Sequence, residues 1–342
     1  MEKRKSVTYV NLLNVMACMC VIGMHCNGLA HTLDGSTAWK RSFCVEVLAY
    51  WAVPIFFMLP GVTMMNYRDR YSTGTFLGRR LKRVGLPLLF WTVVFYAWFL
   101  HEGVHVWAGF RDIINRIVSF QIVGTYWFFG PLLMLHLSMP VLSKLRGDLK
   151  LIKYTIIIGV TTVSLLPFLF NLMGLKYNKD LCFPVTGGYI FYPLIGYYLH
   201  ETELKTWQQY VIYILGILGA VVRYFHTSWT LYNYGIASML TWGYTNVPVL
   251  LMAVAIFLFA KNICKTGFFQ NEKVQKGLQW LSGASFGIYL IHVFVMNFIA
   301  GKLGIRPSNW LWQWFGALLV YGVCILIVKS LQKTPIGKYI IP

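Results

Sequence analysis

Long apolar stretches recur along this sequence and constrain its fold more than any other feature. Runs such as 152–170 and 249–260 are almost continuously apolar. Only 12% of the residues are charged, where a soluble domain has about a quarter. Stretches of about 18 or more apolar residues can cross a bilayer as helices, and their continuity excludes the alternating pattern of a membrane β-barrel. The sequence therefore predicts an all-α polytopic membrane protein that forms one domain over residues 1–342.

The basic residues give the predicted spans an orientation. Lys3, Arg4 and Lys5 precede the first apolar run, which places the N-terminus in the cytoplasm by the positive-inside rule. Alternation then puts most of the 30 Lys and Arg residues, and both termini, on the cytoplasmic side. Topology explains most of the net charge of +19, so no nucleic acid partner is expected. About ten spans are expected, at 8–29, 43–65, 85–101, 126–143, 152–173, 184–199, 208–225, 243–260, 281–300 and 311–331.

A few ionisable residues fall inside the predicted spans, where they are costly and indicate function. Among the acidic residues only Glu46 does so, together with His25, His136 and His292. An isolated histidine there is more often a hydrogen-bonded packing residue. Glu46, however, lies at the depth of His25, near the outer end of the next span. A carboxylate beside the imidazole would fix its tautomer and raise its basicity. We therefore predict a catalytic His25–Glu46 pair.

The first span also carries Asn14, which lies eleven positions before His25. Eleven residues make about three helical turns, so the two side chains share one face. The same spacing rises about 16 Å along the helix, which is too far for a direct hydrogen bond. We expect Asn14 and His25 to line one channel, with Asn14 nearer the cytoplasm.

A basic cluster between the second and third spans contains Arg79, Arg80, Lys82 and Arg83. Its density exceeds what topology alone requires. One interpretation is an anchor that contacts anionic lipid headgroups. The other is a site for the phosphates of an anionic cofactor that enters from the cytoplasm, where arginine offers bidentate geometry.

Five segments, in this order, resemble the acyltransferase-3 family of integral membrane acyltransferases. Residues 9–28, YVNLLNVMACMCVIGMHCNG, are similar to its first helix, in which a basic residue precedes a histidine by eleven positions. Residues 53–65, VPIFFMLPGVTMM, resemble its Phe-Phe-x-x-Ser-Gly signature, and 76–91, FLGRRLKRVGLPLLFW, its basic loop. Residues 126–142 and 285–295 resemble its Trp-Phe and Gly-Ile-Tyr-Leu-x-His segments.

This resemblance implies transfer of an acyl group, usually acetyl from cytoplasmic acetyl-CoA, to a hydroxyl of a cell-surface glycan or lipid-linked sugar. The expected place is the bacterial cytoplasmic membrane, amid membrane lipid. His25 matches the essential histidine, which would deprotonate the acceptor or carry the acyl group itself, and Asn27 or Tyr289 would stabilise the oxyanion. The basic cluster matches the acyl-CoA site. The expected substrate channel comprises Asn14, Asn27, Trp127, Tyr289 and His292.

Two residues depart from the family pattern. Asn14 stands where the family has Arg or Lys, and Pro60 stands where it has Ser. An asparagine at this spacing also resembles the heparan-glucosaminide acetyltransferase branch of transmembrane acyltransferases. The identity of the acceptor, the acyl chain length and the oligomeric state are left open by the sequence.

Two segments or likenesses of the chain suggest other functions. The residues from His101 to His105 fit H-E-x-x-H, a pattern in which one helix presents two zinc ligands. Gly103 weakens that helix, and the seven cysteines have no paired spacing, so no metal is expected. Acyltransferase-3-like domains also resemble the membrane half of vancomycin-resistance serine racemases, which implies amino-acid transport. This chain contains no soluble racemase domain; a reading frame that continued past Pro342 would favour transport.

Overall fold

The secondary structure of the described chain is helical. The structure, a computed structural model, describes residues 7–236 and 240–342, and no strand occurs within these ranges. The basic residues 3–5, which orient the predicted topology, lie outside the described residues. The helices are α1 (Thr8–Cys26), α2 (Thr37–Ala49), α3 (Ala52–Met64), α4 (Thr73–Arg80), α5 (Leu86–His101), α6 (Phe110–Val118), α7 (Phe129–Leu142), α8 (Leu149–Val160), α9 (Leu166–Leu172), α10 (Phe191–Glu201), α11 (Thr206–Tyr234), α12 (Val247–Ile263), α13 (Gly267–Gln270), α14 (Glu272–Ser282), α15 (Ser285–Lys302), α16 (Trp310–Gln332) and α17 (Gly337–Ile340).

The predicted class, an all-α polytopic membrane protein, is confirmed. Two of the ten expected spans correspond to shorter helices, since α12 has 17 residues and α10 has 11. At 1.5 Å per residue α10 covers about 16 Å, roughly half the thickness of a bilayer core. Eight segments of the described chain are long and apolar enough to cross a membrane: 8–26, 37–69, 73–101, 124–145, 149–172, 206–234, 285–302 and 310–332.

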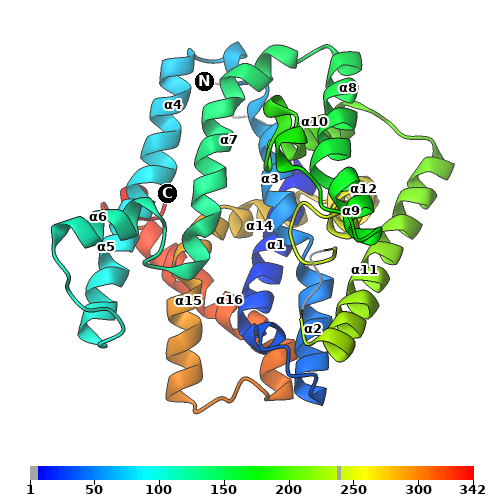
Figure 1. The fold of residues 1–342 in the computed structure, drawn as a ribbon. Coiled ribbons are helices and arrows are strands. Elements are labelled where there is room, and N and C mark those ends of the chain that lie inside the picture. The colour runs from blue at the N-terminus through cyan, green and yellow to red at the C-terminus, as the bar shows by residue number, and fades with distance from the viewer. Residues whose placement is uncertain (1–6, 237–239) are drawn as a thin grey trace.

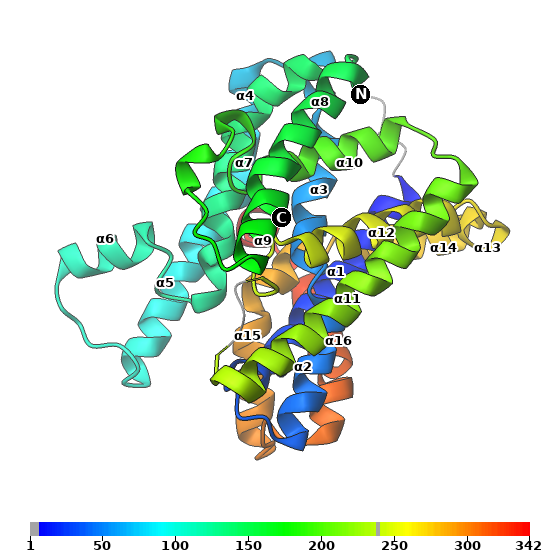
Figure 2. The same ribbon diagram turned by 45° about the vertical axis from the view of Figure 1, so that its right-hand side comes forward.

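Helix α1 lies in the middle of the bundle (Figures 1 and 2). It contacts α2, α3, α12, α14, α15 and α16, so its polar residues face helices from both halves of the chain. Helix α4, with its arginines, lies at the opposite end of the molecule from the turn that joins α15 to α16 (Figure 1). In the orientation predicted from the basic residues, α4 faces the cytoplasm and this turn faces the outer side.

The helix that carries the basic cluster is continuous from Thr73 to His101. Ser72 caps its beginning, where the side-chain oxygen accepts a hydrogen bond from the backbone N–H of Thr75. A π-helical turn, Leu81–Gly85, joins α4 to α5. Such turns insert residues into a helix without ending it and occur frequently at functional sites. Here the turn carries Lys82 and Arg83.

Helices α3 and α10 cross closely because each has a glycine at the crossing. A Cβ on Gly61 would overlap the carbonyl oxygen of Pro193 and lie 2.9 Å from the backbone nitrogen of Tyr197. A Cβ on Gly196 would overlap the carbonyl oxygen of Met58. Small residues at such crossings let membrane helices approach closely. Close packing of α3 on α10 therefore explains why residue 61 is a glycine in this chain.

We expect Gly61→Ala to lower the midpoint of thermal unfolding in detergent, because the added methyl meets backbone atoms that cannot move independently. Gly23→Ala is the matched control, since a Cβ on this buried glycine of α1 would lie 3.8 Å from the Cβ of Ala317. That substitution replaces a helical glycine without a clash, and we expect an unchanged or higher midpoint. Equal midpoints for the two variants would contradict the close crossing.

Candidate functional site

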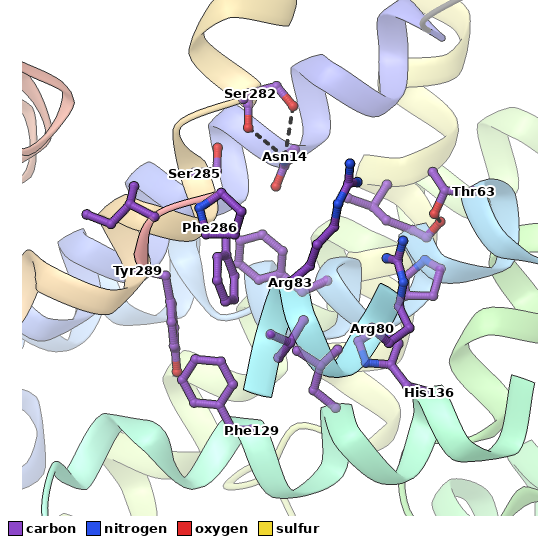
Figure 3. Close-up of a pocket in the computed structure, with 18 of the residues that line it drawn as sticks. Asn14, Thr63, Arg80, Arg83, Phe129, His136, Ser282, Ser285, Phe286 and Tyr289 are labelled. Atoms are coloured by element: carbon purple, nitrogen blue, oxygen red, sulfur yellow. Dashed lines mark hydrogen bonds between the residues drawn. The ribbon is translucent and has the colours of Figure 1, made fainter. Parts of the chain in front are cut away.

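A cavity of 1020 Å³ lies between α1, α3, α7, α15 and the Leu81–Gly85 turn. This volume is at the upper end of the range of small-molecule sites, about 300–1,000 Å³. Its walls are largely apolar, and no acidic residue is among those that line it. Figure 3 shows that the two ends of the cavity differ: Arg80 and His136 lie at one end, and the aromatic residues Tyr289, Phe286 and Phe129 lie at the other.

Three of the four predicted cofactor-binding cations line this cavity, namely Arg80, Lys82 and Arg83. Arg79 does not, because its guanidinium lies over the ring of Tyr71, 4.6 Å from the ring centroid. The Nε of Arg80 is buried and has no hydrogen-bond partner among the described residues. Leaving such a group unsatisfied is costly, so Arg80 has one N–H available for an anionic ligand.

Two further polar atoms in the cavity are buried without a partner in the described structure. They are Nδ1 of His136, a residue of α7 that is 4% exposed, and Oγ of Ser285 at the start of α15. His136 lies beside Arg80 (Figure 3). Together with the Nε of Arg80, these atoms could hydrogen-bond to charged and neutral polar groups of a ligand in the cavity.

Asn14, one of the residues predicted to form the substrate channel, is among those that line the cavity. Its Nδ2 donates to Oγ of Ser282 at 2.8 Å and to the backbone carbonyl of the same residue at 3.3 Å. Asn14 thereby holds α1 against the end of α14, as the dashed lines in Figure 3 mark. The Asn14–Ser282 link was not predicted, since 268 positions separate the two residues in the sequence.

The end of the cavity opposite the cations is aromatic. Tyr289 of α15 packs between Phe128 and Phe129, with ring centroids at 5.4 and 5.5 Å. Its hydroxyl donates to the backbone carbonyl of Thr125 at 2.5 Å, which fixes the ring. We call Phe128, Phe129 and Tyr289 the aromatic layer. Because Tyr289 uses its only O–H on Thr125, its predicted role as an oxyanion donor is not supported.

His25 lies beyond the aromatic layer, paired with His292. Nδ1 of His25 is 2.7 Å from Nε2 of His292, and the two rings stack with centroids 4.9 Å apart. The ring of His292 lies 5.5 Å from that of Tyr289. His25 is not among the residues that line the cavity. The aromatic layer therefore separates the cavity from the histidine pair.

The hydrogen bonds of His292 determine which nitrogen of His25 is basic. Nδ1 of His292 lies 2.7 Å from the backbone carbonyl of Tyr289, which can only accept, so this nitrogen carries the proton. In the neutral pair, Nε2 of His292 must then accept from Nδ1–H of His25. The lone pair of His25 is left on Nε2, which has no partner among the described residues. This is the tautomer of an oriented general base.

The predicted His25–Glu46 pair is wrong. Glu46 is buried, and its Oε1 accepts from a guanidinium nitrogen of Arg223 at 3.0 Å. Its Oε2 lies 3.4 Å from Nε2 of His31. Arg223 also donates to the carbonyl of Thr241 at 2.8 Å. Glu46 therefore belongs to a buried ion pair with Arg223 of α11 and is not the partner of His25.

Asn27 and Trp127 were predicted to line the substrate channel, and their contacts differ from that prediction. Nδ2 of Asn27 donates to the carbonyls of Gly23 and Gln313, at 2.9 and 2.8 Å. Both of its N–H groups are thus used, and no donor remains for an oxyanion. Trp127 stacks on Tyr244 with centroids 5.5 Å apart and does not line the cavity.

The H-E-x-x-H interpretation requires both histidines on one helix, and the chain does not provide it. Helix α5 ends at His101, and Gly103 has a φ of 69°. His105 therefore leaves the helical register that a pair of zinc ligands needs. Within residues 7–236 and 240–342, no group of three or more His, Cys, Asp or Glu residues could hold a metal ion.

Comparison with known proteins supports the resemblance given by the sequence segments. A family model described as an acyltransferase domain, that of the acyltransferase-3 family, matches residues 7–329. This range contains α1, the basic cluster and both histidines of the pair, and it ends before α17. Searches of curated proteins and of solved structures gave no match.

Proposed function

The chain belongs to the acyltransferase-3 family and is a multi-pass membrane acyltransferase, and from this premise we propose its donor and acceptor. The donor is cytoplasmic acetyl-CoA, and the acceptor is a hydroxyl of a cell-surface glycan or lipid-linked sugar. The proposed location is the bacterial cytoplasmic membrane. The observation that carries the proposal is the cavity, with cations at one end and the histidine pair beyond the other.

The residues of the cavity fit an acyl-CoA. Arg80, Lys82 and Arg83 suit its phosphates, and the apolar walls suit a long thin arm. The buried, unpartnered atoms of His136 and Ser285 suit neutral polar groups along that arm. The absence of acidic residues from the lining removes repulsion of a polyanion. The aromatic layer lies next to the histidine pair, where the acyl end of the donor is expected.

His25 performs the proton transfer in this proposal. The donor supplies an acyl group on a thioester. Nε2 of His25 accepts the proton of the acceptor hydroxyl as the oxygen bonds to the acyl carbon and the carbon–sulfur bond breaks. His25 then returns this proton to the leaving sulfur. Throughout, Nδ1–H of His25 donates to His292, and His292 donates to the carbonyl of Tyr289, which keeps the ring oriented.

The donor site is tested by Arg83→Gln and Arg79→Gln, two variants of the same residue type on the same helix. We expect Arg83→Gln to raise the KM for acetyl-CoA about tenfold, because it removes a charge-assisted contact with phosphate. Arg79→Gln should leave this KM unchanged, since Arg79 lies over Tyr71 outside the cavity. The assay measures thiol release from acetyl-CoA by purified protein in detergent, with water as the acceptor. Equal effects of the two variants would contradict the assignment.

The acceptor class is tested in cells. Surface glycans are extracted from strains with and without the gene, and their O-acetyl content is compared by mass. We expect acetyl groups to be lost with the gene and restored by the wild-type chain but not by His25→Ala. Unchanged O-acetyl content would exclude the glycan acceptor, while absence of acetyl-CoA turnover in detergent would exclude the donor.

A further inference from the structure

The chain beyond α16 turns back and lines the cavity. Lys338 and Tyr339 of α17, together with Ile341 and Pro342, are among its lining residues. This segment, residues 337–342, follows the range that the family model matches, which ends at residue 329. The basic cluster and the 337–342 segment thus meet at one cavity from distant parts of the sequence.

The 337–342 segment is held in place by specific contacts. Nε1 of Trp91 donates to the carbonyl of Ile340 at 2.9 Å, and Ile341 is completely buried. Gly287 of α15 leaves room for it, since a Cβ there would lie 2.5 Å from Cγ2 of Ile341. The backbone N–H of Ile341 donates to the carbonyl of Gly337 at 2.8 Å. These contacts fix the segment in place, and it forms one wall of the cavity.

The side chains of this wall are of the kinds that bind a nucleotide. Lys338 adds a fourth cation to Arg80, Lys82 and Arg83 in a cavity without a lining acid. Tyr339 follows it and also lines the cavity, and 57% of its surface is exposed. Nζ of Lys338 lies 4.9 Å from the centroid of the Tyr339 ring. An exposed aromatic face next to a cation suits a base that stacks on the ring and a phosphate that follows it.

We infer that Lys338 and Tyr339 bind the nucleotide end of the donor, Lys338 its phosphates and Tyr339 its adenine ring. This inference rests on the proposed function, because it assigns one end of the proposed donor. It adds a recognition element outside the basic cluster, in a segment for which the sequence predicts no role. Phosphate recognition by Lys338 could serve an anionic lipid headgroup instead, and the test separates the two sources.

The test compares acetyl-CoA with S-acetylpantetheine, which lacks both the nucleotide and all of the phosphates. Lys338→Gln and Tyr339→Ala should each raise the KM for acetyl-CoA about tenfold without changing kcat. Neither should change the KM for the shorter donor. Tyr339→Phe should retain the wild-type KM, since its ring can still stack. Lys333→Gln is the matched control, because Lys333 is exposed but does not line the cavity.

A change in KM that is equal for both donors, or no change for acetyl-CoA, would overturn the inference. Assays with and without phosphatidylglycerol form the lipid arm. If Lys338→Gln lost only a response to this lipid, the lysine would serve a headgroup and the inference would be wrong. Calorimetric binding of CoA to wild type and Lys338→Gln separates this inference from the proposed function. Equal affinities would reject the inference, whereas acetyl-CoA that binds but is not turned over would reject the function alone.

Discussion

Replacing His25 by alanine is expected to lower the rate of acyl transfer by about 10²–10⁴-fold, the usual contribution of a general base. The KM for acetyl-CoA should change little, because His25 does not line the donor cavity. The two constants are measured from thiol release by purified protein in detergent, with water as the acceptor. Wild-type turnover in His25→Ala would exclude His25 as the base.

The partner residue provides a second measurement on the same pair. His292→Phe keeps a ring in place but removes the nitrogen that accepts from His25, so the orientation of the base is lost. We expect about 10–100-fold slower turnover, as when an orienting partner behind a functional histidine is removed. His101→Ala is the control, since His101 is exposed and lies at the end of α5. A loss in this control equal to that of His292→Phe would indicate a general effect on folding.

Glu46→Gln is expected to destabilise the fold strongly rather than to slow chemistry. It leaves the guanidinium of Arg223, which is 0% exposed, without its carboxylate. Breaking a buried ion pair typically costs about 3–5 kcal/mol, because the remaining charge is uncompensated. The midpoint of thermal unfolding in detergent should fall markedly, while turnover per folded molecule should stay close to wild type.

An exposed ion pair supplies the control for this prediction. Glu272 pairs with Lys276 at 2.7 Å, and their side chains are 79% and 71% exposed. Glu272→Gln should shift the midpoint little, since such pairs contribute about 0–1 kcal/mol. If Glu46→Gln kept the wild-type midpoint but lost turnover, Glu46 would act in catalysis as its sequence position first indicated.

The fold class could be predicted because the bilayer imposes a length and a composition on every span. Helices α10 and α12, in two of the ten expected spans, have 11 and 17 residues and are shorter than the typical span of about 20 residues. Their surroundings explain this. Helix α10 is buried along most of its length and packs closely on α3 through Gly61 and Gly196. A helix enclosed by protein needs no fixed length, and apolar composition alone does not reveal the enclosure.

The candidate site was predicted in part. Helical spacing predicts that Asn14 and His25 lie far apart on one helix, and charge density singles out Arg80, Lys82 and Arg83, which line the cavity. The depth of a residue does not give the rotation of its helix, and for this reason Glu46 was paired with the wrong residue. His292 was placed in the channel, but its bond to His25 joins residues 267 positions apart, which one sequence cannot reveal. Lys338 carried no signal, since a lysine after a last span is expected from topology.

The aromatic layer has a consequence for the membrane itself. A protein that admits a hydrophilic donor from one side of the membrane and an acceptor from the other must avoid a continuous water path, through which protons would leak and dissipate the proton gradient. Protons cross a bilayer readily wherever water forms an unbroken file. Phe128, Phe129 and Tyr289 present packed rings at this position, and the Tyr289 hydroxyl is already bonded to Thr125. We therefore expect the enzyme without bound substrates to be impermeable to protons, so that the proton gradient across the membrane is maintained.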